Sequence, residues 1–133
     1  MKYLWLILLF VGTSAHAYTI KELRDDCLAA EAFYAQTGSN DIYQAVKSGR
    51  CIAYLAGFAD GFAVSDYLAD KVGVNLNAFC LPKDDKNLSP RLVRAVLAQL
   101  DRQPPNADGS TAMLVAGALA KSFPCTDSLE SKK

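Results

Sequence analysis

The chain has 133 residues with 14 basic and 14 acidic side chains, so its formal charge at neutral pH is zero. Proteins that bind nucleic acid or an anionic membrane use a basic surplus to release counterions, and this chain has no such surplus. Hydrophobic residues make up 51% of the chain and charged residues 21%, which is typical of a globular protein. The length predicts a single domain.

The first 17 residues have the features of a cleavable secretory signal peptide. Lys2 precedes a short apolar run over residues 3–11, and Ala15-His16-Ala17 matches the small-x-small pattern of a cleavage site. The run is about half as long as the roughly 20 residues that a membrane span requires. We therefore predict a signal peptide over residues 1–17 and an exported domain over 18–133 that leaves the membrane after cleavage; a buried N-terminal helix is the alternative.

Removal of this segment changes the chemistry available to the mature chain. The only histidine, His16, is lost, and 116 residues remain with 13 basic and 14 acidic side chains. Catalysis of the Ser-His-Asp or Cys-His type needs an imidazole, and so do zinc sites built on histidine. The carboxylate pairs Asp66/Asp70 and Asp84/Asp85 lack a calcium-loop motif and indicate solvated surface charge. We predict no enzymatic activity, no metal site and no cofactor.

Four cysteines lie in the mature chain: Cys27, Cys51, Cys80 and Cys125. An even number in a small exported protein predicts disulfides, which four cysteines can form in three ways. A four-thiolate zinc site is the alternative, but it requires closely spaced pairs, whereas these gaps are 24, 29 and 45 residues. The spacing therefore favours two disulfides.

Two helices are expected before residue 72. Thr19 and Glu22 form a T-x-x-E capping box at the start of the first helix. Residues 37–41 end that helix and cap a second one over about 42–71, in which Gly49 is the candidate position for a break. The apolar face of the first helix comprises Leu23, Cys27, Ala30 and Tyr34.

The turn between these helices suggests the first disulfide. Cys27 lies 12 residues before Ser39, and Cys51 lies 12 residues after it. In an antiparallel helix pair that turns near Ser39, equal separations place the two sulfur atoms at the same height. We therefore predict the pair Cys27–Cys51.

A second helical hairpin is expected after residue 88. Ser89 is an N-cap followed by proline, residues 104–109 form the turn, and Pro124 ends the second helix. Cys80 precedes this hairpin and Cys125 follows it, so both lie at its open end, which predicts the pair Cys80–Cys125. The apolar faces of the two helices comprise Leu92, Val93, Val96, Leu97, Leu100, Leu114, Val115, Ala118 and Leu119. The fold class predicted from these patterns is all-α, a small disulfide-stapled bundle of two helical hairpins.

Two glycines in the long helix mark a smooth face. Gly57 and Gly61 lie four residues apart, on the same face as Ala53. We expect this groove to let another helix approach closely, the alternative being a surface that lines a ligand. Asp60 lies between the glycines and is either a hydrogen-bonded structural carboxylate or a solvent-facing one.

Three segments together resemble the Rap/Tai family of immunity proteins. Residues 51–60 read CIAYLAGFAD and resemble that family's C-x-G-Y-I-x-G-x-x-D helix, with Ala53 in place of the usual glycine. Residues 79–82 read FCLP, as in the family. Residues 112–125 resemble its closing A-x-x-L-V-x-x-A-L…F-P-C pattern. The likeness covers nearly the whole mature chain.

The resemblance implies a function in the periplasm. Rap/Tai proteins are immunity proteins against peptidoglycan amidases of the type VI secretion system. They block the Cys-His catalytic cleft of the amidase sterically, often as homodimers, and need no catalytic groups of their own. The function implied here is that of a periplasmic amidase inhibitor whose partners are a secreted effector and a second copy of the chain.

The residues that contact the effector are expected on rigidly presented loops at the two ends of one helix. The candidates are Lys83, Asp84, Asp85, Lys86, Asn87, Arg102, Gln103, Asn106 and Asp108. The alternative for these loops is that they are ordinary solvated turns. The alternative for the whole protein is a small periplasmic stress-protective chaperone, which would need an exposed apolar patch.

Overall fold

The computed structural model of the chain describes residues 17–103 and 109–125. Within these ranges it contains four helices and no strand: α1 (Ile20–Tyr34), α2 (Ile42–Lys71), α3 (Leu88–Asp101) and α4 (Thr111–Ser122). The predicted all-α class is confirmed. The predicted signal peptide falls outside the described residues, except for Ala17.

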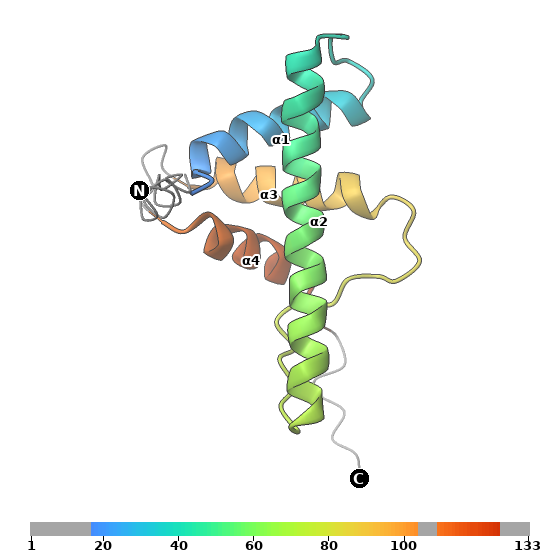
Figure 1. Cartoon of the computed structure of the whole chain (residues 1–133), viewed down its shortest axis with the longest axis vertical. Coiled ribbons are helices and arrows are strands. Elements are labelled where there is room, and N and C mark those ends of the chain that lie inside the picture. Colours follow the sequence, from blue (N-terminus) through green and yellow to red (C-terminus); the bar gives the residue numbers. More distant parts are fainter. Residues whose placement is uncertain (1–16, 104–108, 126–133) are drawn as a thin grey trace, which may run out of the picture.

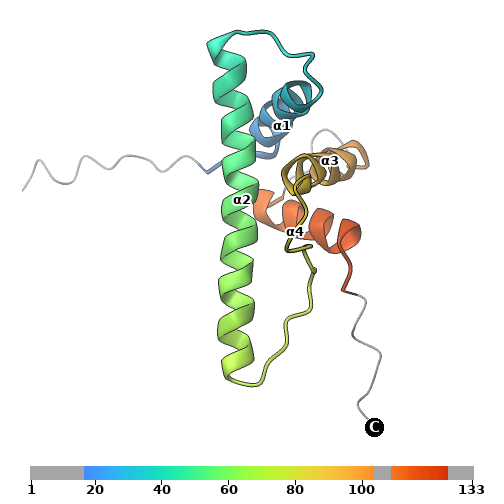
Figure 2. The same cartoon turned by 90° about the vertical axis from the view of Figure 1, so that its right-hand side faces the viewer.

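The long helix α2 crosses the other three. Figure 1 shows α1, α3 and α4 as three tiers, one above another, with α2 running across them. Figure 2 shows the same layer from the side, with all three short helices on one face of α2. Three helices packed about 10 Å apart form a layer of roughly 30 Å, whereas 30 residues of helix extend about 45 Å. Both ends of α2 therefore extend beyond the layer.

The first two helices begin where the sequence predicts. The Thr19 hydroxyl accepts a hydrogen bond from the Glu22 backbone N–H at 3.2 Å, and Glu22 Oε2 accepts one from the Thr19 N–H at 2.8 Å. At the start of α2, the Asp41 carboxylate accepts the Tyr43 N–H at 3.1 Å. The predicted limits of α2 are confirmed, and the helix continues through Gly49 without a break.

The predicted N-cap of α3 is wrong by two residues. The helix begins at Leu88 with Asn87 as N-cap, so Ser89 lies within its first turn. The preceding backbone is ordered by Asp85, whose carboxylate accepts the Asn87 N–H at 2.8 Å and also binds the Arg91 guanidinium. Because this carboxylate turns the chain into the helix, the start shifts towards the N-terminus, and Pro90 still lies where a helix needs no N–H donor.

The core lies where the four helices meet. It is built on the predicted apolar faces, and α2 contributes few residues to it: only Ser48, Cys51 and Leu55 are buried in that helix. The buried hydrophobic cluster comprises Leu23, Cys27, Ala30, Cys51, Leu55, Phe79, Leu92, Val93, Ala95, Val96, Leu100, Leu114, Val115, Ala118, Leu119 and Phe123. The middle of α2 therefore covers one side of a core that is formed mainly by the three short helices.

Both predicted disulfides are confirmed. Cys27 and Cys51 join α1 to α2 with their Cα atoms 5.1 Å apart, and both side chains are fully buried. Cys80 and Cys125 are joined with Cα atoms 5.0 Å apart, at the open end of the α3–α4 hairpin. In the first hairpin α1 lies across α2 instead of along it (Figures 1 and 2). The bridge still forms there because it requires only that the two Cα atoms lie close at the crossing.

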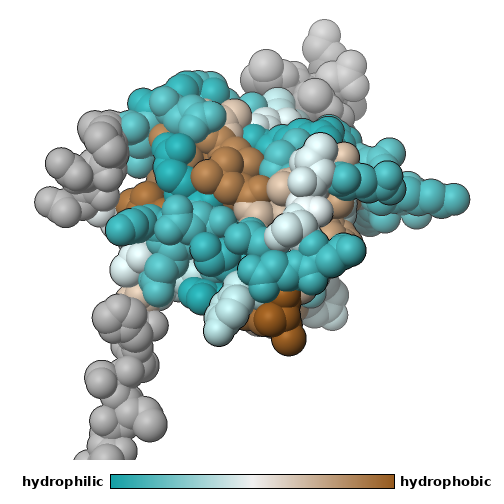
Figure 3. Space-filling model, turned by 90° about the horizontal axis from the view of Figure 1, so that it is seen from above, coloured by the Kyte–Doolittle hydropathy of each residue, from teal (hydrophilic) through white to brown (hydrophobic). Residues whose placement is uncertain are grey.

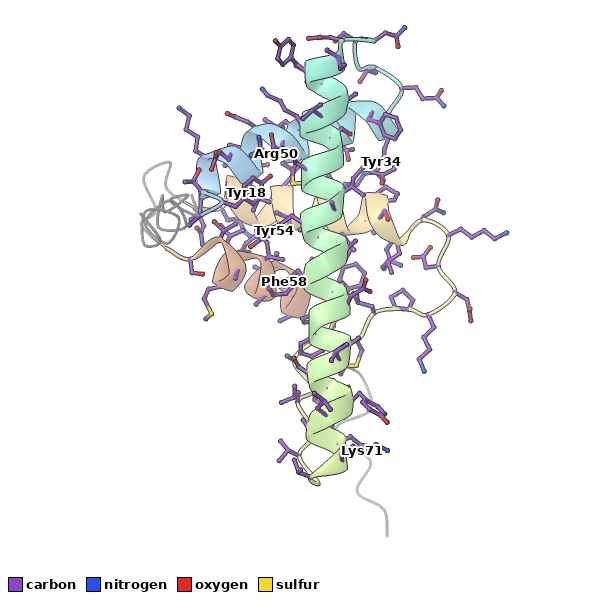
Figure 4. The ribbon with its side chains drawn as sticks, in the orientation of Figure 1. Tyr18, Tyr34, Arg50, Tyr54, Phe58 and Lys71 are labelled. Atoms are coloured by element: carbon purple, nitrogen blue, oxygen red, sulfur yellow. A yellow bond between two sulfur atoms is a disulfide. The ribbon has the colours of Figure 1, made fainter. Side chains whose placement is uncertain are left out.

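A buried carboxylate ties Tyr18, just before α1, to the bundle. Asp26 on α1 is 2% exposed, accepts a hydrogen bond from the Tyr18 hydroxyl at 2.6 Å and pairs with Arg50 Nε at 3.1 Å. The Tyr18 ring packs against Tyr54, with centroids 4.9 Å apart, and its backbone carbonyl accepts the Thr111 hydroxyl at 2.6 Å. Figure 4 shows Tyr18, Arg50 and Tyr54 gathered on one side of α2. Burial raises the pKa of Tyr18, and Asp26 raises it further, so the phenol stays protonated.

Candidate partner-binding surfaces

The first predicted contact loop precedes α3 and is held in shape from within. Lys83, Asp84, Lys86 and Asn87 are exposed, whereas Asp85 is half-buried. The hydrogen bond that Asp85 accepts from Arg91 lowers the pKa of its carboxyl group, and the bond from the Asn87 N–H lowers it further. Because the charged carboxylate orders the turn, the neighbouring lysines are displayed from a defined backbone.

The second predicted contact segment follows α3. Arg102 is exposed and donates to the Gln99 side-chain oxygen at 2.8 Å, and Gln103 is partly buried. The end of α3 is fixed to α1 by Arg24, which donates to the Leu100 carbonyl at 2.6 Å. The remaining candidates, Asn106 and Asp108, lie outside the described residues.

The structure does not bring the two predicted loops together. They flank α3, whose 14 residues span about 20 Å. Figure 1 shows the two ends of α3 on opposite sides of the bundle, with residues 83–87 at one end and residues 102–103 at the other. A partner that touched both loops would have to extend along the whole of α3.

The glycine face of α2 is open: we expect another helix to approach it closely, and none of the described helices of this chain does. Gly57 and Gly61 are exposed, and a Cβ atom built on either would meet no atom within 4 Å. Asp60 is also exposed and makes no hydrogen bond or ion pair within the described ranges, in agreement with the solvent-facing alternative. The reason is the crossed arrangement, in which the short helices all lie on another face of α2.

The C-terminal end of α2 carries a surface that sequence reasoning missed. We call residues 64–76, the last turns of α2 and the segment that follows them, the arm. Figure 1 shows this end of α2 projecting below α4, and Figure 4 marks Lys71 near its tip. Its exposed apolar side chains are Val64, Tyr67, Leu68, Val72, Val74 and Leu76. The helical spacing of the first three could have revealed a continuous stripe, but the same spacing is typical of a buried face.

The opposite end of α2 also exposes apolar side chains. They belong to the α1–α2 hairpin and comprise Leu28, Phe33, Ile42, Tyr43 and Val46. Seen from this end, hydrophobic surface lies among hydrophilic side chains (Figure 3). Exposed apolar groups at both ends of one long helix indicate surfaces available for binding.

The helices, disulfides and exposed surfaces of the described residues indicate a class of protein. No group of three His, Cys, Asp or Glu side chains suited to a metal ion occurs in the part of the chain that the structure describes. None of the described helices is both long and apolar enough to cross a membrane. What the described residues offer is a disulfide-bonded helical domain with ordered loops and exposed apolar side chains, which is the form of a small binding protein.

The family follows from the sequence as a whole. The profile of the Rap1a immunity proteins matches residues 19–125, so the chain belongs to the Rap1a immunity protein family. No curated protein and no solved structure matches the chain. The resemblance found in the sequence is thereby confirmed, and it identifies an immunity protein whose partner is a secreted type VI effector.

Proposed function

We propose that the protein is a periplasmic immunity protein that binds and sterically inhibits a peptidoglycan amidase delivered by the type VI secretion system. The observation that carries this proposal is the match to the Rap1a immunity proteins over residues 19–125. The amidase, as the target, comes from the resemblance of the 51–60, 79–82 and 112–125 segments to the Rap/Tai pattern. Export through a signal peptide over residues 1–17 would bring the inhibitor to the compartment that holds peptidoglycan.

Steric inhibition requires shape and rigidity, and the fold supplies both. An amidase of the Cys-His type is inactive when its cleft is filled, because the substrate peptide can no longer reach the nucleophile. Two disulfides fix the helices to one another, so that little conformational entropy is lost on binding. The inhibitor itself performs no chemical step.

The proposal includes a contact surface and an oligomeric state. Lys83 to Asn87 and Arg102 to Asp108 are the polar contact candidates, with Arg102 as an anchor because arginine is favoured at interface hot spots. The second copy in a homodimer would use the apolar side chains of the α1–α2 hairpin, at the end of α2 that lies away from the arm. Light scattering of the mature protein tests the homodimer.

Co-expression tests the function. The mature protein is directed to the periplasm together with each peptidoglycan amidase effector that the source genome encodes. Cells that survive one effector, and a complex that elutes as a single peak in size exclusion, are the expected result. Lysis equal to that with an empty vector, for every effector, would show that the protein is no amidase inhibitor.

A chaperone remains a second candidate because the structure exposes large apolar side chains at both ends of α2. A holdase would suppress the thermal aggregation of several unrelated client proteins. An immunity protein would leave their aggregation unchanged and would capture one amidase in a fixed ratio. Light scattering of client proteins with and without the mature protein separates the two functions.

A further inference from the structure

We propose that the arm is the principal docking element for the effector, inserting its apolar side chains into a concave, basic-rimmed site on the amidase. The proposal rests on the immunity function above and assigns the contact to residues 64–76, which the resemblance does not mark. Four properties support it: the arm is uncovered, apolar, rigid and acidic.

The arm exposes several large apolar side chains close together along the chain. Leu68 is 59% exposed, Val72 is 76% exposed and Val74 is 50% exposed, although they lie within seven consecutive residues. Isolated exposed apolar residues are ordinary, but a contiguous group at the end of a projection marks a binding site. Burying such side chains in a partner removes apolar surface from water, which favours the complex.

The tip of the arm has a fixed backbone. The Val74 N–H donates to the Ala69 carbonyl at 2.9 Å, and the Gly73 N–H donates to the Asp70 carbonyl at 3.0 Å. These two bonds form a Schellman motif, and Gly73 adopts the left-handed φ of 77° that the motif requires. Val72 and Val74 are thus presented from a closed turn, so that docking would order little of the backbone.

The base of the arm is anchored to the core. The Phe62 ring stacks on Phe79 with centroids 4.0 Å apart, and Phe79 is 4% exposed. Phe58 adds a second stacked contact with the same ring, at 6.5 Å. The helix therefore leaves the bundle at a defined point, and beyond it Val64, Tyr67 and Leu68 are exposed.

The charge of the arm specifies the partner. Asp66 and Asp70 make no ion pair with any described residue, and the adjacent Lys71 lies over the Tyr67 ring at 4.8 Å. The negative end of the α2 macrodipole lies at the same tip. Four other carboxylates are paired with arginine, namely Asp101 with Arg24, Asp26 with Arg50, Asp85 with Arg91 and Glu31 with Arg94. Unpaired carboxylates beside an apolar wedge fit a partner whose apolar cleft is rimmed by Lys or Arg.

The same charges argue against a second copy of this chain as the occupant. In a two-fold contact each surface meets itself. Each arm carries Asp66 and Asp70 but only one cation, Lys71, so two arms packed on each other would bring together more carboxylates than cations. The effector is therefore the occupant that the charge favours.

The test compares arm variants with matched controls in binding to purified amidase effectors of the source genome, each with its catalytic cysteine replaced by alanine. The double variant Leu68→Gln/Val72→Gln is expected to bind at least about 30-fold more weakly, as loss of a hot spot does. The variant Asp66→Lys/Asp70→Lys is expected to associate about tenfold more slowly at low salt. The controls are Met113→Gln on α4, where the side chain is 73% exposed, and Asp25→Lys on α1; both should bind within about twofold of the wild type.

Each outcome decides a different part of the proposal. If the wild type binds no effector, the proposed function as an amidase inhibitor is wrong, and the arm has no amidase to dock on. If the wild type binds and both arm variants bind as tightly as the controls, the arm is not the docking element although the function stands. If light scattering shows that arm variants convert a wild-type dimer to monomers, the occupant is a second copy instead. Unchanged melting temperatures show that every variant is folded.

Discussion

The two halves of α2 belong to one helix and have opposite surroundings. The half before Gly57 crosses the bundle, buries Cys51 and Leu55 and is bridged to α1. The half after it contacts the bundle through Phe58 and Phe62 and then leaves it. Both halves consist largely of apolar and small residues, so composition does not distinguish a core segment from a binding segment. The difference arises from the length of the helix relative to the layer that covers it.

The first prediction concerns the disulfide in the packed half. Replacing Cys27 and Cys51 by alanine should lower the free energy of unfolding by about 4 kcal/mol, because a 24-residue loop is released and two fully buried sulfur atoms are lost. Urea denaturation measures the change. The Cys80–Cys125 disulfide closes a longer loop, but Cys80 is exposed. Replacing this pair by alanine should therefore lower the free energy of unfolding by a smaller amount. A larger loss for the Cys80/Cys125 variant would show that loop length outweighs burial in setting the effect.

The second prediction compares two leucines in the same helix. Leu55 is 1% exposed, and Leu55→Ala should cost about 2–5 kcal/mol because it leaves a cavity in the core. Leu68 is 59% exposed, and Leu68→Ala should change stability by less than about 0.5 kcal/mol. Thermal denaturation of both variants tests the pair. A large loss from Leu68→Ala would mean that the arm is covered in solution.

The third prediction concerns the glycine at the boundary between the halves. Gly57→Ala should stabilise the protein by about 1 kcal/mol, because alanine is the better helix former and its Cβ meets no atom within 4 Å. The same reasoning applies to Gly61→Ala on the same face. Calorimetry gives the sign directly. A lower melting temperature for either variant would show that a second molecule packs on this face.

The fourth prediction is the smallest and concerns pH. The pKa of Tyr18 is raised in the folded protein by burial and by Asp26, so the folded state favours the protonated phenol. Stability from this group is therefore present below about pH 10, the pKa of an unperturbed tyrosine, and declines as the pH rises beyond it. Urea denaturation of the wild type and of Tyr18→Phe between neutral and strongly alkaline pH measures the slope. The variant should lose less stability over that interval, and parallel curves would contradict the assignment.

Sequence patterns predicted the local features well. The capping box at Thr19 and the apolar faces of α1, α3 and α4 depend on residues within one or two turns of each other. The Cys80–Cys125 pair follows from flanking positions on a hairpin, whereas the Cys27–Cys51 pair forms because the two Cα atoms lie 5.1 Å apart where α1 crosses α2. These inferences hold because the physical cause lies close along the chain or follows from connectivity.

The crossing itself could not be predicted. Helical periodicity shows which face of a helix is apolar and does not say which helix will cover it. The sequence therefore does not reveal that the Gly57 face is open within the chain or that Leu68 is exposed. The Tyr18–Asp26–Arg50 cluster was also missed, since it joins residues far apart in sequence whose types are common on surfaces. Such features depend on how the tiers stack, which only the tertiary structure shows.

The Tyr18–Thr111 hydrogen bond has a consequence for the order of folding. It joins residues 93 positions apart, so it cannot form until nearly the whole domain has emerged from the machinery that synthesises or translocates it. Contacts of such high sequence separation require closure of a large loop, which slows folding. Until then the Tyr18 carbonyl lacks its hydrogen bond from Thr111. We therefore expect the buried Cys27–Cys51 disulfide to form early and the Tyr18–Thr111 hydrogen bond to form last.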